Sequence, residues 1–65
     1  MSTNSAQTYS RIRREAFRFT QMDLAMSFAM RTDDLHVVLG DCPEILVVPL
    51  AQATWLVRHG YEMVA

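Results

Sequence analysis

The sequence predicts a small α+β domain with an N-terminal helical segment, followed by a β-hairpin, a helix and a third short strand in the order β-β-α-β. Three observations carry this prediction. Apolar residues recur at helical spacing up to residue 31, two short apolar runs flank a turn after residue 34, and a proline begins the last helical stretch. The chain has 65 residues, so we expect residues 1–65 to form a single domain.

The N-terminal helical segment follows a polar start. Residues 1–8 are small and polar, and we expect them to be frayed. After them, one side of a helix collects apolar residues at spacings of three and four: Tyr9, Ile12, Ala16, Phe19, Met22, Met26 and Ala29. One long helix fits this stripe, but two short helices over residues 8–19 and 21–31 suit the dimensions of a small domain better.

The boundary between the two helices lies at Thr20–Asp23, which is typical of a capping box because a hydroxyl and a carboxylate are three residues apart. A short strand over residues 16–20, in which Phe17 and Phe19 alternate with polar residues, is the alternative. The stretch 21–31 is apolar on nearly every side, which predicts burial on more than one flank.

The next two apolar runs are predicted strands. Leu35–Leu39 contains β-branched residues and is bounded by acidic residues and a glycine. Ile45–Val48 follows after Gly40–Glu44, a connection made of turn-forming residues. Two such runs separated by five residues predict an antiparallel hairpin.

The last segment carries the start and stop signals of a helix. Pro49 suits the first turn, and residues 50–59 continue without a breaker to Gly60, which suits a left-handed helix cap. Tyr61–Val64 then alternates with period two. It predicts a third short strand, running parallel to the second strand of the hairpin.

Cysteine usage and hydropathy indicate the compartment. The chain has one cysteine, Cys42, so it cannot form an internal disulfide, and a reducing environment suits such a chain. No apolar run has the roughly 18 residues of a membrane span. We therefore expect a cytoplasmic protein that has no membrane partner.

Catalytic and metal chemistry are disfavoured by the residues available. Cys42 with His36 or His59 is the one set that supplies both a nucleophile and a base. Asp41 and Glu44 flank the thiol, however, and a reactive cysteine needs cationic neighbours. The spacings typical of metal sites and phosphate-binding glycine loops are absent from the sequence. We expect no enzyme activity, no catalytic residue, no metal and no cofactor.

The charges are divided between the two halves of the chain. Residues 1–31 hold five arginines and two acidic residues, whereas residues 32–65 hold one arginine and five acidic residues. The predicted partner-binding surface is an acidic edge made of Asp33, Asp34, Asp41, Glu44 and Glu62. The alternative surface is a basic face on the first helix, made of Arg11, Arg13, Arg14 and Arg18.

An acidic edge suits docking on a basic surface of a larger protein or protein complex, including one that binds nucleic acid. Together with the size of the chain, it favours a small non-enzymatic protein-interaction module, such as an inhibitor or accessory protein from a phage or mobile element, for example an anti-CRISPR-type inhibitor. Two alternatives stay open: a dimeric DNA-binding regulator that uses the arginine-bearing helix, and a structural subunit of a larger assembly. Nucleic acid is the less favoured partner, and a monomer is favoured over a homodimer.

Overall fold

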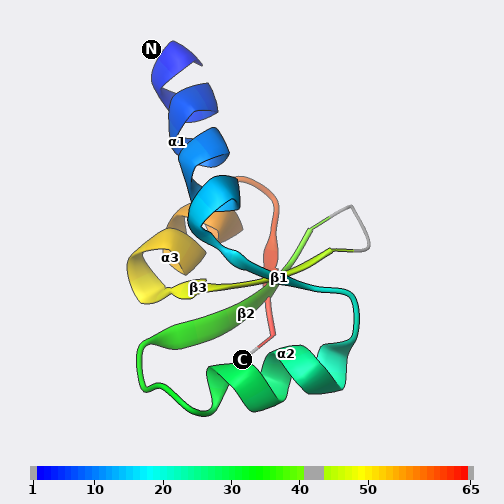
Figure 1. The fold of residues 1–65 in the computed structure, drawn as a ribbon. Helices are drawn as coiled ribbons and strands as arrows, with labels where there is room; N and C mark the ends of the chain where they lie inside the picture. Colours follow the sequence, from blue (N-terminus) through cyan, green and yellow to red (C-terminus); the bar gives the residue numbers. More distant parts are fainter. Residues whose placement is uncertain (1, 41–43, 65) are drawn as a thin grey trace.

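The computed structural model describes residues 2–40 and 44–64 (Figure 1). The elements follow one another as α1 (Ser2–Glu15), β1 (Phe17–Phe19), α2 (Met22–Ala29), β2 (Leu35–Leu39), β3 (Ile45–Pro49), α3 (Leu50–Arg58) and β4 (Glu62–Met63). The predicted α+β class and the β-β-α-β order after the helices are confirmed. The strand β1, between the two N-terminal helices, is an addition to that order.

The sheet has the strand order β1-β3-β2-β4, and each neighbouring pair is antiparallel. In the hairpin of β2 and β3, Leu39 lies opposite Ile45. On its other side β2 pairs with β4, where Leu39 lies opposite Glu62. Because β2 is antiparallel to both, β4 runs in the same direction as β3, as predicted, but β2 separates them.

The strand β1 corrects the prediction of two helices over 8–19 and 21–31. The first helix ends at Glu15, and the alternative of a short strand holds for Phe17–Phe19. The reason is that Phe17 and Phe19 share one face of a strand, and both rings pack against Phe28, at centroid distances of 4.7 and 5.4 Å. Cross-strand pairing with β3 and this aromatic packing outweigh the helical spacing of the stripe.

The start of the predicted helical segment and the boundary inside it also differ from expectation. Residues 2–8, expected to be frayed, belong to α1. The predicted capping box at Thr20–Asp23 does not form, because the N-cap residue of α2 is Gln21 and it makes no side-chain cap. Asp23 instead accepts a hydrogen bond from the amide of Leu24 at 3.0 Å.

The sheet lies between two helical layers, with α1 and α3 on one face and α2 on the other (Figure 1). The cluster on the α1 and α3 face contains Ile12, Val38, Leu46, Val48, Ala53 and Leu56. The cluster on the α2 face contains Ala25, Ala29, Val37, Ile45 and Val47. The apolar stripe is therefore divided: its residues up to Ala16 pack on one face, and those from Phe19 onward pack on the other.

The helix α2 is covered on one side, which corrects the prediction of burial on more than one flank. Ala25 and Ala29 are buried against the sheet. Leu24 and Met30, however, are 52% and 81% exposed. The stretch from Leu24 to Met30 thus leaves apolar side chains in contact with solvent.

The end of α3 confirms the role predicted for Gly60, whose φ is +103°. The amide of Tyr61 donates to the carbonyl of Leu56 at 3.0 Å, and that of Gly60 donates to the carbonyl of Val57 at 3.3 Å. These two hydrogen bonds form a Schellman motif, in which glycine occupies the left-handed position. The motif turns the chain from α3 into β4.

The helix α1 projects from the body of the molecule (Figure 1). It contacts the sheet through its last turns, where Ile12 is buried and Tyr9 is partly buried, and Ala16 directly after the helix is partly buried as well. The molecule is therefore elongated, with a longest dimension of 36 Å against a shortest of 18 Å.

Candidate functional site

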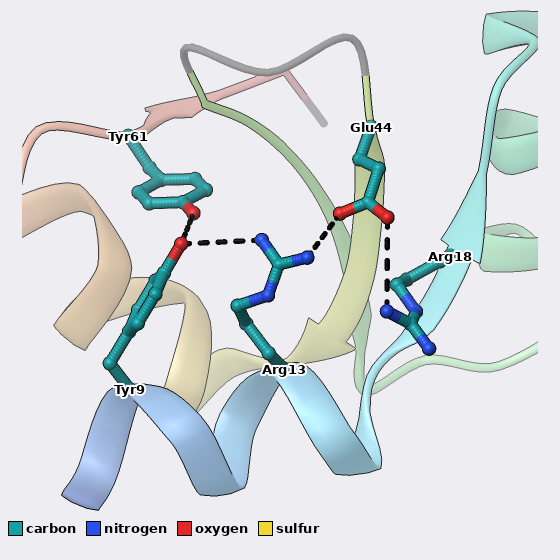
Figure 2. Close-up of polar contacts among 5 residues, drawn as sticks. All are labelled: Tyr9, Arg13, Arg18, Glu44 and Tyr61. Atoms are coloured by element: carbon teal, nitrogen blue, oxygen red, sulfur yellow. Dashed lines mark hydrogen bonds and ion pairs between the residues drawn. The ribbon is translucent and has the colours of Figure 1, made fainter. Parts of the chain in front are cut away.

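A cluster of polar side chains joins α1 to the sheet and to the end of the chain (Figure 2). Arg13 Nη2 donates to Glu44 Oε1 at 2.6 Å, and Arg13 Nη1 donates to the hydroxyl of Tyr9 at 3.3 Å. The Tyr9 hydroxyl in turn lies 2.6 Å from that of Tyr61. On the other side of the carboxylate, Arg18 Nη1 lies 3.8 Å from Glu44 Oε2. Glu44 thus links α1, β1 and the start of β3.

The cluster changes the protonation equilibria of two of its members. Hydrogen bonds to Tyr9 and Glu44 raise the pKa of Arg13 above its already high usual value, so this guanidinium is permanently charged. Burial, and then the hydrogen bond with Tyr9, raise the pKa of Tyr61 from 10.0 to about 12. At neutral pH the cluster therefore contains neutral Tyr61 and a charged Arg13 that is compensated by Glu44.

The cluster divides the four arginines of the predicted basic face. Arg13 and Arg18 face Glu44. Arg11 and Arg14 are exposed, and within the described residues neither forms an ion pair. Together with Gln7 and Thr8, these two arginines line a shallow hollow on α1.

The residues of the predicted acidic edge do not form one continuous surface. Glu44 and Glu62 lie at the same end of the sheet, as expected, because Leu39 is opposite both Ile45 and Glu62. Glu44, however, is engaged by two arginines. Asp33 and Asp34 precede β2 at its opposite end, and Asp41 lies outside the described residues.

The prediction from sequence missed an exposed apolar surface beside β1. Phe17 and Leu24 are 51% and 52% exposed, and the ring of Phe28 contacts that of Phe17. Leu24 and Phe28 are four residues apart on α2, so their side chains lie on the same flank of the helix. We call Phe17, Leu24 and Phe28 the apolar flank. The signal for it in the sequence was the apolarity of residues 22–30 on all sides.

The histidines and the cysteine are not brought together in the described part of the chain. His36 lies in β2, whereas His59 stacks on Trp55 with a ring-centroid distance of 3.8 Å. His59 Nδ1 donates to the carbonyl oxygen of Trp55 at 2.8 Å, and Cys42 lies outside the described residues. Within the described ranges, 2–40 and 44–64, no three His, Cys, Asp or Glu residues are grouped so that they could hold a metal ion.

Among the residues that the structure describes, no helix has both the length and the apolar character needed to cross a membrane. No family model matches the chain, and no curated protein or solved structure is similar enough to it to count as a match.

Proposed function

We propose that this chain is a small non-enzymatic protein-interaction module that docks through the apolar flank, with Asp33 and Asp34 at the border of the interface. The supporting observation is the exposure of Phe17 and Leu24 around the half-covered ring of Phe28. Large apolar side chains that stay exposed together mark protein-binding surfaces more often than scattered ones do. Aromatic anchors of this kind supply most of the affinity of such interfaces.

The two aspartates that follow α2 favour a basic partner, and Arg31 in the same connection offsets one of their charges. Asp33 and Asp34 are exposed in the connection that follows α2, close in sequence to the exposed Met30. Charged residues at the border of an apolar interface chiefly increase the association rate and exclude partners of like charge. This retains the two aspartates from the predicted acidic edge, and it leaves Glu44 to its role within the fold.

More specifically, we propose that the protein is an inhibitor or accessory protein from a phage or mobile element, for example of the anti-CRISPR type. A basic, nucleic-acid-binding protein fits the aspartate border. A chain of 65 residues that covers such a surface acts by occupying it, which requires no catalytic chemistry.

The test compares two leucines of nearly equal exposure. Leu24, in the apolar flank, is 52% exposed, and Leu50, on α3, is 50% exposed. After the partner is isolated from the host by affinity capture, its affinity for purified variants is measured by surface plasmon resonance. We expect Leu24→Ser to raise the dissociation constant roughly tenfold or more, because burial of a leucine contributes about 1.5–3 kcal/mol. Leu50→Ser should have little effect.

The aspartates provide a second arm of the same experiment. Asp33→Lys with Asp34→Lys should slow association, and more so at low salt, where charges are less screened. Equal effects of Leu24→Ser and Leu50→Ser would contradict the proposed surface. A dimer mass in light scattering that Leu24→Ser converts to a monomer mass would assign the apolar flank to a second copy of the chain instead.

A further inference from the structure

The outward face of α1 is a second surface, of different chemistry, and we propose that it binds the phosphate backbone of nucleic acid. Arg11 and Arg14 are exposed on this face, and neither forms an ion pair with a carboxylate of the described residues. The nearby Glu15 instead accepts a hydrogen bond from Gln52 at 3.3 Å. Two guanidinium groups that form no ion pair within the described residues are therefore held on a projecting helix (Figure 1).

The spacing of the polar residues on α1 suits successive phosphates. Gln7, Arg11 and Arg14 are separated by four and three residues, which places them on one face, with rises of about 6 and about 4.5 Å between them. That face points away from the buried Ile12. Arginine, glutamine and threonine side chains are common donors to phosphate oxygens, and these residue types line the hollow on α1.

The composition of this face favours phosphate over an acidic protein. Protein interfaces need apolar or aromatic anchors at their centre. The exposed residues of α1 that are described from residue 6 onward include no large apolar side chain: Ala6, Gln7, Ser10, Arg11, Arg14 and Glu15. Contacts to phosphate need no such anchor, because their affinity comes from the release of counterions.

The position of the acidic residues is compatible with this binding mode. Asp33 and Asp34 lie in the connection between α2 and β2, at the end of the molecule away from the free end of α1 (Figure 1). Glu44 is nearer to α1, but Arg13 and Arg18 compensate its charge. The exposed residues of α1 thus carry two arginines, Arg11 and Arg14, against one glutamate, Glu15, so their balance is positive although the whole chain has a net charge of −1.

The first measurement is fluorescence anisotropy of a labelled short DNA duplex titrated with the full chain. Two arginines that each neutralise one phosphate predict a slope near −2 for log affinity against log salt. The affinity should therefore fall roughly tenfold between about 50 and about 200 mM salt. The dissociation constant near physiological salt should be on the order of 10⁻⁴ M, the weak end of sequence-independent binding, and roughly tenfold lower at the lower salt concentration. An absence of binding at the lower salt concentration would overturn the proposal.

Two double variants distinguish binding through the α1 face from a general effect of net charge. Arg11→Gln with Arg14→Gln should abolish the binding. The matched control is Arg31→Gln with Arg58→Gln, which removes the same charge from two other exposed arginines and should leave most of the affinity. Equal losses in the two double variants would overturn the proposal, because net charge alone would then explain the binding.

Two further arms distinguish the ligand and the surface. A polyglutamate of the same charge should compete poorly with the duplex; efficient competition would reassign the α1 face to an acidic protein and so overturn the proposal. Leu24→Ser should bind the duplex as the unchanged protein does. Binding of DNA therefore succeeds or fails independently of docking through the apolar flank.

Discussion

Gly60 ends α3 with a φ of +103°, and the backbone rather than a lack of space excludes other residues there. A side-chain carbon placed at Gly60 would have no atom within 4 Å. Gly40 has the opposite constraint, because a side-chain carbon placed there would lie 2.8 Å from Cζ of Tyr61. Both glycines thus help to place Tyr61. Gly60 turns the chain directly before Tyr61, and Gly40 leaves room for its ring.

We expect Gly60→Val to lower the free energy of unfolding by about 1–2 kcal/mol, which is the cost of the left-handed conformation for a residue with a side chain. Urea denaturation measures this change. Gly60→Asn is the control and should cost less, because asparagine tolerates positive φ. An unchanged midpoint in Gly60→Val would show that the Schellman motif contributes nothing to stability.

The raised pKa of Tyr61 predicts a loss of stability in alkali. Folding favours the neutral phenol, so this contribution is complete below the usual pKa of 10.0 and is lost as the pH rises through about 12. Tyr61→Phe removes the titration and also the hydrogen bond with Tyr9. The variant should therefore be less stable at neutral pH, and the difference in Tm should narrow above pH 10. A constant difference across this range would contradict the assignment.

At the scale of elements, the ion pair of Glu44 with Arg13 adds a polar contact to the apolar packing of Ile12 that holds α1 against the sheet. The Glu44 and Arg13 side chains are 32% and 28% exposed, so the ion pair is only partly shielded from solvent. Exposed pairs contribute about 0.2–1 kcal/mol, and hydrogen bonds to charged groups contribute somewhat more. We expect Glu44→Gln to destabilise the fold by about 1 kcal/mol, which lowers Tm by roughly 4–8 °C in a domain of this size.

Hydrogen exchange locates the effect of Glu44→Gln. Protection should fall more in α1 than in the β2–β3 hairpin, because the substitution releases Arg13 while the buried hairpin keeps its contacts. Asp34→Asn is the control: it removes the same charge from an exposed residue, and the described residues provide Asp34 with no ion pair. A uniform loss of protection over the whole chain would contradict a local role for Glu44.

The elements that the sequence predicts correctly are those with strong local signals. The strands β2 and β3 are apolar runs bounded by turn-forming residues. The end of α3 is marked by Gly60, which suits a left-handed cap. The boundary at residues 16–20 was misjudged because the helical stripe continues across β1 without interruption. Helical periodicity predicts which residues are buried, but it does not predict on which face of the sheet they pack. The face is decided by the pairing of β1 with β3, which carries the chain from one side of the sheet to the other.

At the scale of the whole molecule, the candidate surfaces were predicted only in part. The sequence identifies the arginines and the acidic residues, but pairing between residues 31 positions apart, such as Arg13 and Glu44, has no local signal. That pairing brings Arg13 and Arg18 of the predicted basic face together with Glu44 of the predicted acidic edge. The apolar flank was missed for a similar reason, because helical periodicity does not show that α2 is covered on one side only.

The order β1-β3-β2-β4 also bears on aggregation. The strand β3 contains four consecutive buried apolar residues, Ile45 to Val48, and on the side away from the hairpin it is paired only by the three residues of β1. An uncharged apolar run of this kind, in which three of the four residues are β-branched, readily pairs with identical strands when its edge is open. Detachment of the N-terminal segment would open that edge, so β1, with the charge of Arg18 at its centre, protects the protein against assembly into intermolecular sheets.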